Sequence, residues 1–469
     1  MRENNVLLYF LGVLLPPLCT VFLLSHNFLL GGFIVLIASF LFIAFFSPQF
    51  RFHFLIGLFF IQNIAFSKGN IIIFPLDIIF IFFTGYILID TFYKRHTDNR
   101  EFNKNLKILF SLYLVFFSVV LFSFFCNLSK FDSIIIITSL FYIARFLQLL
   151  LMIYMITIIK THFTLIESVF DSIIIWAVIQ LPFGLLQISN GKDMYGTLTA
   201  HHGYLGTLLI IPFFLSLYKL SNSLQQKKGR GVTLYYIFAS LIILYIIFGT
   251  GCRSALLGLF VSLFIFAINI LLKKNFKIVI ASLIFSSILI FVSLKFTPLS
   301  SVIEETFHNS ETNGNVDISS LSRFLIWKYT WKNFVEFPLI TKVIGIGIGT
   351  FPFLEQHFVL WAGLSKFSGA HLNLLHILVE TGILGLLSFL IIFSYTFYYL
   401  HRFSNFQISR MATLMTIALL LSGLTQETFW FQSSYGTTYL FYIMIITLIF
   451  KQINNYSKVN PKKLKSNIR

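Results

Sequence analysis

Charged side chains are scarce in this sequence of 469 residues, and acidic ones are scarcer than basic ones. Asp, Glu, Lys and Arg together make up 11% of the chain, against about a quarter of a typical soluble domain. Hydrophobic residues make up 57%, and the mean hydropathy is +0.87. This composition excludes a water-soluble globular domain and indicates an integral membrane protein.

Cysteine is also rare, with three residues at Cys19, Cys126 and Cys252. Their number is odd and they show no C-x-x-C spacing, so neither a disulfide framework nor a metal cluster is indicated. We find no metal-ligand spacing elsewhere, and we expect no metal and no cofactor. The first apolar run lacks a small-residue cleavage site, which predicts an uncleaved first helix.

Long polar stretches are few, whereas apolar runs of about 18 to 25 residues recur along the whole chain. Because open sheets cannot satisfy their backbone in lipid, we expect an all-α polytopic membrane protein with about 12–14 transmembrane helices. The predicted spans are 7–25, 28–47, 53–67, 71–92, 108–126, 133–158, 164–187, 203–219, 232–249, 254–271, 278–296, 372–398, 410–427 and 436–450.

The basic residues occur in alternate connections, which predicts a cytoplasmic N-terminus by the positive-inside rule. The net charge of +17 is then explained by membrane topology and by attraction to anionic lipid. The basic residues are scattered over many loops and form no single patch, which argues against nucleic-acid binding. We expect a single membrane domain over residues 1–469 with a basic cytoplasmic tail at 452–469. Residues 297–371 are predicted to form one large extracytoplasmic loop.

Within this loop, SSLSRFLIWKYTWKNFVEF predicts an amphipathic helix capped by Ser319 or Ser320. At about 100° per residue, its aromatic side chains share one arc and its charged side chains form a separate stripe. The aromatic face contains Phe324, Trp327, Trp331 and Phe334, and the charged stripe contains Lys328, Lys332 and Glu336. We expect the aromatic face to be buried, either at the membrane interface or over a membrane-embedded cavity.

Arg323 lies close to Phe334 on this helical wheel and away from the lysine stripe. It is therefore not simply part of the solvated face. A headgroup contact made by a snorkelling arginine is the alternative.

Arg253, in TGCRSALLGL, stands where a predicted span begins on the extracytoplasmic side. A helix start carries partial positive charge and free N–H groups, so an added guanidinium creates an anion site suited to phosphate. A headgroup anchor is the alternative, although the positive-inside rule makes arginine uncommon on this side.

His371 is predicted at the extracytoplasmic mouth of a later span, in GAHLNLLHILVETGILGLLSFL. An imidazole, with an ordinary pKa of about 6.5, can act as a base near neutral pH. A capping or solvated histidine is the alternative.

Four further residues are accessory candidates. Arg145 lies inside a predicted span, where an arginine is either functional or paired with a buried carboxylate. Glu380 would lie on the opposite helix face from His371, so a structural ion pair is expected for it. His201 and His202 precede another span and can contact acceptor sugar or simply lie at the interface. GIGIGTF follows no strand, which excludes a nucleotide fingerprint and predicts a tight backbone turn.

The order and spacing of these motifs resemble a known family. TGCRSALLGL is followed by SRFLIW, by GIGIGTF, and by HLNLLHILVETGILG, in which Glu and Gly stand nine and eleven residues after the His. The stretch from about residue 176 to 390 resembles the O-antigen ligase superfamily, which includes O-antigen ligases, related polymerases and protein O-oligosaccharyltransferases. Members usually carry Asn directly after the His, where this chain has Leu372.

This resemblance implies a GT-C-like transferase in the bacterial inner membrane, with its active site facing the periplasm and an undecaprenyl-diphosphate-linked glycan as donor. Arg253 and Arg323 match the family's diphosphate-binding positions, and His371 matches its catalytic position. Two arginines can stabilise a leaving diphosphate without a metal. The acceptor stays open between lipid A-core, another glycan, as in O-antigen or capsular polymerases, and protein.

A lipid-linked oligosaccharide flippase or other transporter is the alternative from a different class. Transporters tend to show internal repeats and charges near the bilayer midplane. We find no such repeat by inspection, and the candidate charges gather at one membrane face.

Overall fold

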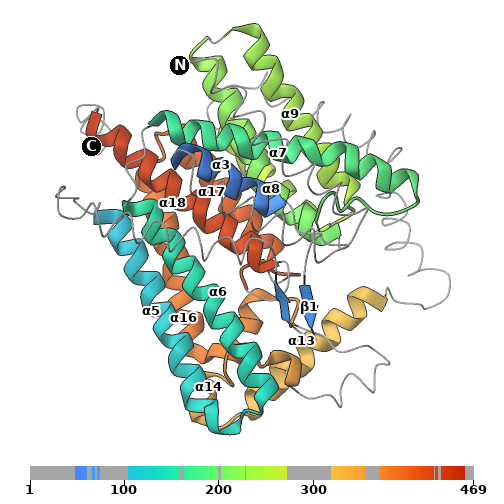
Figure 1. Ribbon diagram of the computed structural model, residues 1–469, viewed down its shortest axis with the longest axis vertical. Helices are drawn as coiled ribbons and strands as arrows, with labels where there is room; N and C mark the ends of the chain where they lie inside the picture. The colour runs from blue at the N-terminus through green and yellow to red at the C-terminus, as the bar shows by residue number, and fades with distance from the viewer. Residues whose placement is uncertain are drawn as a thin grey trace.

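The computed structural model describes residues 48–60, 66–68, 71–73, 104–158, 163–198, 202–227, 229–271, 318–354, 369–426, 428–430 and 435–459. Within these residues the protein is an assembly of long helices (Figure 1). The helices are α3 (Pro48–Phe60), α5 (Lys104–Asn127), α6 (Ser133–Ile158), α7 (Phe163–Ser189), α8 (His202–Gln225), α9 (Arg230–Gly249), α10 (Arg253–Leu271), α13 (Ile318–Glu336), α14 (Leu339–Ile344), α16 (Asn373–Arg402), α17 (Gln407–Ser422) and α18 (Tyr435–Val459).

The expected helical membrane architecture is confirmed. Seven of the described helices, namely α5 to α9, α16 and α18, are long and apolar enough to cross a bilayer. Two shorter apolar helices, α10 and α17, pack against each other, and Gly258 allows the close approach because a Cβ there would lie 2.1 Å from the carbonyl oxygen of Ala418. The predicted spans at 7–25, 28–47 and 278–296 lie outside the described residues.

The boundaries of two predicted spans, 53–67 and 71–92, are wrong. α3 ends at Phe60, and a short antiparallel hairpin follows, formed by β1 (Phe66–Lys68) and β2 (Ile71–Ile73). The hydrophobic runs are continuous in sequence, and periodicity alone does not separate a short apolar strand from a helix.

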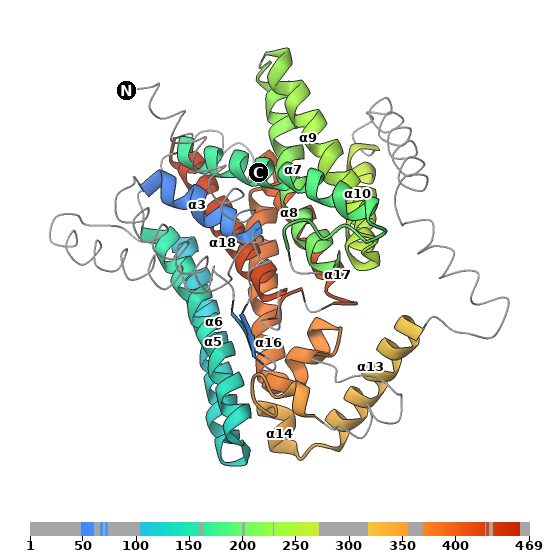
Figure 2. The ribbon, with the colours of Figure 1, turned by 45° about the vertical axis from the view of Figure 1, so that its right-hand side comes forward.

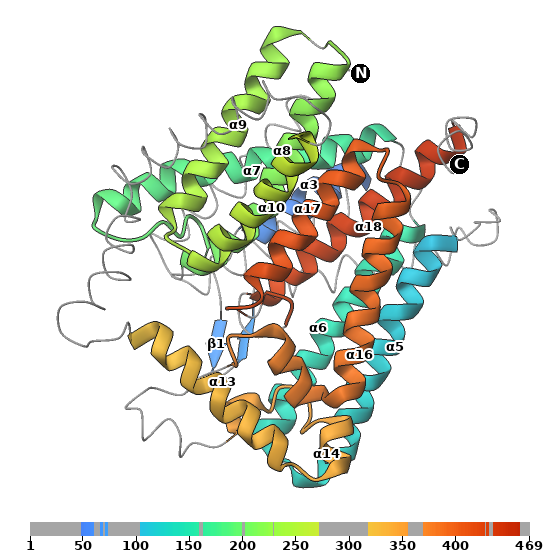
Figure 3. The ribbon, with the colours of Figure 1, turned by 180° about the vertical axis from the view of Figure 1, so that it is seen from behind.

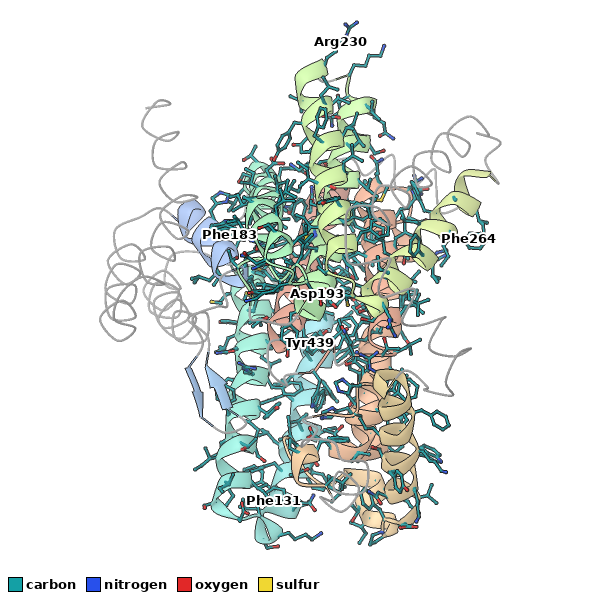
Figure 4. All side chains as sticks on the ribbon, turned by 90° about the vertical axis from the view of Figure 1, so that its right-hand side faces the viewer. Phe131, Phe183, Asp193, Arg230, Phe264 and Tyr439 are labelled. Carbon is teal, nitrogen blue, oxygen red and sulfur yellow. The ribbon has the colours of Figure 1, made fainter. Side chains whose placement is uncertain are left out.

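The α5–α6 and α8–α9 connections lie at opposite ends of the bundle. Figure 4 shows Arg230, the first residue of α9, at one end and Phe131, in the α5–α6 connection, at the other. Asp193, in the α7–α8 connection, lies between these levels. The α5–α6 hairpin therefore projects further on its side than the α7–α8 connection does.

The α13 and α14 helices lie at the projecting end, beside α16 (Figures 2 and 3). α16 is kinked at Gly382, whose φ of 69° and ψ of −170° are not helical. The glycine-rich turn packs into this kink: Ile346 N donates to Val379 O at 3.0 Å, and Gly347 N donates to Glu380 O at 3.0 Å.

Glycine is required on both sides of this contact. Gly345 and Gly382 both have positive φ, and a Cβ on either would lie 2.3 Å from a backbone oxygen of the other segment. Gly347 and Gly349 also have positive φ, so the predicted tight turn in GIGIGTF is confirmed. The turn fixes the first part of α16, which follows His371.

Candidate functional site

Arg253 is the first residue of α10, in agreement with the prediction from TGCRSALLGL. The preceding connection is tightly built: Gly251 has a φ of 60°, and Cys252 N donates to Thr250 Oγ1 at 3.2 Å. The Arg253 side chain is half-buried. A guanidinium at a helix N-terminus is therefore present here, as the proposed anion site needs.

The Arg253 connection is joined to the connection between α17 and α18. We use the name α17–α18 connection for its described residues, 423–426 and 428–430. The buried side chain of Gln426 accepts a hydrogen bond from Thr207 Oγ1 at 3.2 Å, and its Oε1 lies 3.8 Å from Cys252 Sγ. Cys252 is the direct neighbour of Arg253.

His371 lies at a left-handed backbone position with a φ of 50°. Such a conformation is uncommon for a residue other than glycine and occurs often at functional sites. The N-cap residue of α16 is Leu372, and no side-chain cap is made there, so His371 is not the cap of this helix.

Asn373 joins the start of α16 to the α17–α18 connection. Its backbone N–H donates to Gly423 O at 3.0 Å, and its Oδ1 accepts from Phe429 N at 3.2 Å. Both hydrogen bonds are buried. The turn that carries His371 therefore rests on the same connection that Gln426 joins to the neighbour of Arg253.

Arg323 lies on the buried side of α13. Among the α13 side chains that the structure describes, Ile326, Thr330 and Phe334 are buried, and Arg323 falls about 20° from each of the last two at 100° per residue. Trp327, one turn after Arg323, donates from Nε1 to Ala370 O at 2.9 Å. Because Ala370 precedes His371, this bond places α13 against the turn that carries His371.

One expectation for α13 is wrong: the helix begins at Ile318, which puts Ser319 and Ser320 inside its first turn rather than before it. Of the aromatic face, Phe334 is buried against the protein, whereas Phe324 and Trp331 are 61% and 54% exposed on its surface. Burial of this face at the membrane interface stays a prediction. The charged stripe is exposed as predicted, with Lys332 Nζ 3.8 Å from Glu336 Oε1.

Glu380 is fully buried and has three polar partners, which fits the expected structural role. Its carboxylate accepts from Phe351 N and from Trp430 Nε1, each at 2.9 Å, and His376 Nε2 lies 3.4 Å from Oε1. His376 also stacks against Phe351, with ring centroids 4.7 Å apart.

Sequence reasoning missed His376, although the H-x-x-x-E spacing over one helical turn signals such a pair. The His376–Glu380 pair joins α16 to the glycine-rich turn and to Trp430 of the α17–α18 connection. It therefore stabilises the backbone around His371.

The other accessory candidates lie on α6 and at the start of α8. Arg145 in α6 is buried, with 3% of its surface exposed, and its guanidinium lies 4.6 Å from the centre of the Phe141 ring. His201 lies outside the described residues, and His202 is described only as the first residue of α8. Within the described ranges, no group of three or more His, Cys, Asp or Glu side chains could hold a metal ion.

Comparison with known proteins bears on the same part of the chain. Residues 238–390 match the O-antigen ligase family. The matched segment contains Arg253, Arg323, His371 and Glu380, and it ends where the motif resemblance ends. The resemblance to this family is thereby confirmed over about a third of the chain.

One similar protein is the teichuronic acid biosynthesis protein TuaE of Bacillus subtilis (strain 168). It is 25% identical over 217 residues, which cover 46% of this chain and 42% of the relative. The chain thus matches less than half of the length of that relative.

Proposed function

We propose that this protein is a membrane glycosyltransferase that transfers a glycan from undecaprenyl diphosphate to an acceptor hydroxyl. One observation carries the proposal. The neighbours of Arg253, Arg323 and His371 are linked through Gln426, Trp327 and Asn373 into one continuous set of contacts. Three residues predicted from separate motifs thus lie on segments that one chain of contacts joins: Arg253 and His371 through the α17–α18 connection, and Arg323 through Ala370.

In the proposed reaction, the acceptor oxygen attacks the anomeric carbon of the donor glycan, and the bond from that carbon to the diphosphate oxygen breaks. His371 takes the proton of the acceptor hydroxyl, a contribution of about 10²–10⁴-fold. Arg253 and Arg323 bind the diphosphate and stabilise the negative charge that it gains on leaving.

Ligation to lipid A-core is the first candidate for the acceptor step. Polymerisation onto another glycan is the second, and the similarity to a teichuronic acid biosynthesis protein favours it. In both cases we place the enzyme in the bacterial cytoplasmic membrane as a multi-pass protein, with its site facing the periplasm.

Reconstitution in liposomes tests this proposal. The purified protein receives a glycan linked to undecaprenyl diphosphate, either alone or with lipid A-core, and products are separated by size. A ladder from donor alone identifies a polymerase, and a product on lipid A-core identifies a ligase. Movement of intact donor across the bilayer without either product contradicts the proposal and favours the flippase.

A further inference from the structure

Two buried amide side chains, Gln426 and Asn373, stand between the residues of the proposed site and have no part in the proposed chemistry. Both are at most 5% exposed. Burying an amide in a membrane protein is costly unless its polar atoms are hydrogen-bonded. Their bonds therefore show what they hold in place.

Gln426 holds the α17–α18 connection against α8 and against the connection before α10. Oε1 accepts from Thr207 Oγ1, while Nε2 lies 3.6 Å from Cys252 Sγ. The Cys252 position is itself confined, since a Cβ on Gly206 would lie 2.8 Å from Cys252 Cβ. The Gln426 contacts consequently fix the residue next to Arg253.

Asn373 holds the other side of the same connection. It binds Gly423 through its backbone and Phe429 through Oδ1. Its Nδ2 is buried without a hydrogen-bond partner among the described residues. Gly423 packs directly against that amide, because a Cβ there would lie 2.1 Å from Nδ2.

The unpartnered Nδ2 shows that Asn373 is not explained by packing alone. An apolar side chain of similar size would avoid this orphaned donor. Only an acceptor at this position satisfies Phe429 N and so keeps the α17–α18 connection on the turn that carries His371.

We infer that Gln426 and Asn373 are positioning residues, which set the separation between the diphosphate-binding Arg253 and the base His371 through the α17–α18 connection. This inference rests on the proposed transferase function. Each residue acts through a neighbour: Gln426 through Cys252, and Asn373 through the first turn of α16.

The two residues therefore affect different kinetic constants. Gln426→Ala removes the contacts that hold Cys252, the neighbour of Arg253. The KM for donor should therefore rise about tenfold or more, with a smaller change in kcat. Asn373→Ala removes the hydrogen bond that holds the turn carrying His371 on the α17–α18 connection. The kcat should then fall about tenfold to hundredfold, because small displacements of a catalytic group are costly, while the KM for donor should change little. Since both act through one connection, the double variant should be non-additive.

The experiment measures donor KM and kcat of the full chain in liposomes for both variants. Matched controls are Leu424→Ala and Leu374→Ala, which truncate neighbouring side chains that are 39% and 36% exposed. Thermal unfolding in detergent is recorded for each protein. We expect the change in KM for Gln426→Ala and the change in kcat for Asn373→Ala, while both variants unfold at temperatures close to those of the controls.

Three outcomes overturn it. Unchanged kinetics in both variants, alongside an active wild type and inactive Arg253→Gln, remove the positioning role and leave the proposed function intact. Equal losses of kcat in both variants that follow the fraction of folded protein show a purely structural role. A wild type that transfers no glycan overturns the proposed function and this inference with it.

Discussion

At the scale of single residues, Arg323 separates diphosphate binding from headgroup contact. Lysine keeps the charge of arginine but loses the planar fork that binds two phosphate oxygens at once. We expect Arg323→Lys to raise the donor KM by about tenfold or more, because a bidentate contact is lost. Donor titration of transfer activity in liposomes measures this.

Lys328→Arg is the matched control, because Lys328 lies on the exposed stripe of the same helix. It should leave the donor KM unchanged. Full activity of Arg323→Lys would instead support the headgroup alternative.

His371 is the second residue whose role can be isolated. His371→Ala should lower kcat by about 10²–10⁴-fold while donor binding stays near that of the wild type, because the base acts on the acceptor. If neutral imidazole is the active form, the wild-type rate should rise as the pH is raised and then level off. Turnover and donor affinity are measured separately over this pH range.

His401→Ala, an exposed histidine near the end of α16, is the control and should behave as the wild type. Normal turnover of His371→Ala removes the base from the mechanism. Lost donor affinity with intact turnover assigns His371 to the diphosphate instead.

At the scale of helices and turns, the kink of α16 depends on Gly382. Alanine there would need a φ of 69° and would place its Cβ 2.3 Å from Val343 O. We expect Gly382→Ala to lower the free energy of unfolding by roughly 1–3 kcal/mol or more, since strain and the clash add. Thermal unfolding in detergent measures the loss.

Gly231→Ala is the control, because among the described residues no atom beyond its own turn of α9 lies within 4 Å of an added Cβ. Being inside α9, it should be neutral or slightly stabilising. Equal unfolding temperatures for the two variants would show that the kink does not require glycine.

The same elements show how far sequence reasoning reaches. Periodicity predicted the α13 helix and its charged stripe, and the alternating glycines predicted the tight turn before Phe351. Periodicity reports which residues share a face, but not which face meets the protein. In a membrane protein an apolar face can meet lipid, so the exposure of Phe324 and Trp331 could not be derived.

Contacts between distant segments were also beyond the sequence. The partner of the glycine-rich turn is the kink near Gly382, and the partners of Glu380 include Trp430, fifty residues further along the chain. Arg253, Arg323 and His371 were predicted one by one from their chemistry and motifs. The residues between them, Gln426 and Asn373, carry no motif and become visible only through their hydrogen bonds.

At the scale of the whole molecule, the proposed mechanism relies on side chains of the protein to stabilise the negative charge of the leaving diphosphate. The donor is already activated as a diphosphate, and two guanidinium groups can supply the electrostatic stabilisation that a divalent ion supplies in other transferases. We therefore expect transfer in liposomes to continue unchanged in excess EDTA and without nucleoside triphosphate. Product formation with and without chelator measures this.

Arg253→Gln gives this experiment its internal comparison. With one guanidinium removed, the remaining charge no longer balances the diphosphate, so activity should fall sharply and added Mg²⁺ should restore part of it by binding the same oxygens. Wild-type protein should show no such response to Mg²⁺. If EDTA abolishes wild-type transfer and Mg²⁺ restores it, the arginines do not carry the leaving-group charge alone, and a metal ion belongs in the mechanism.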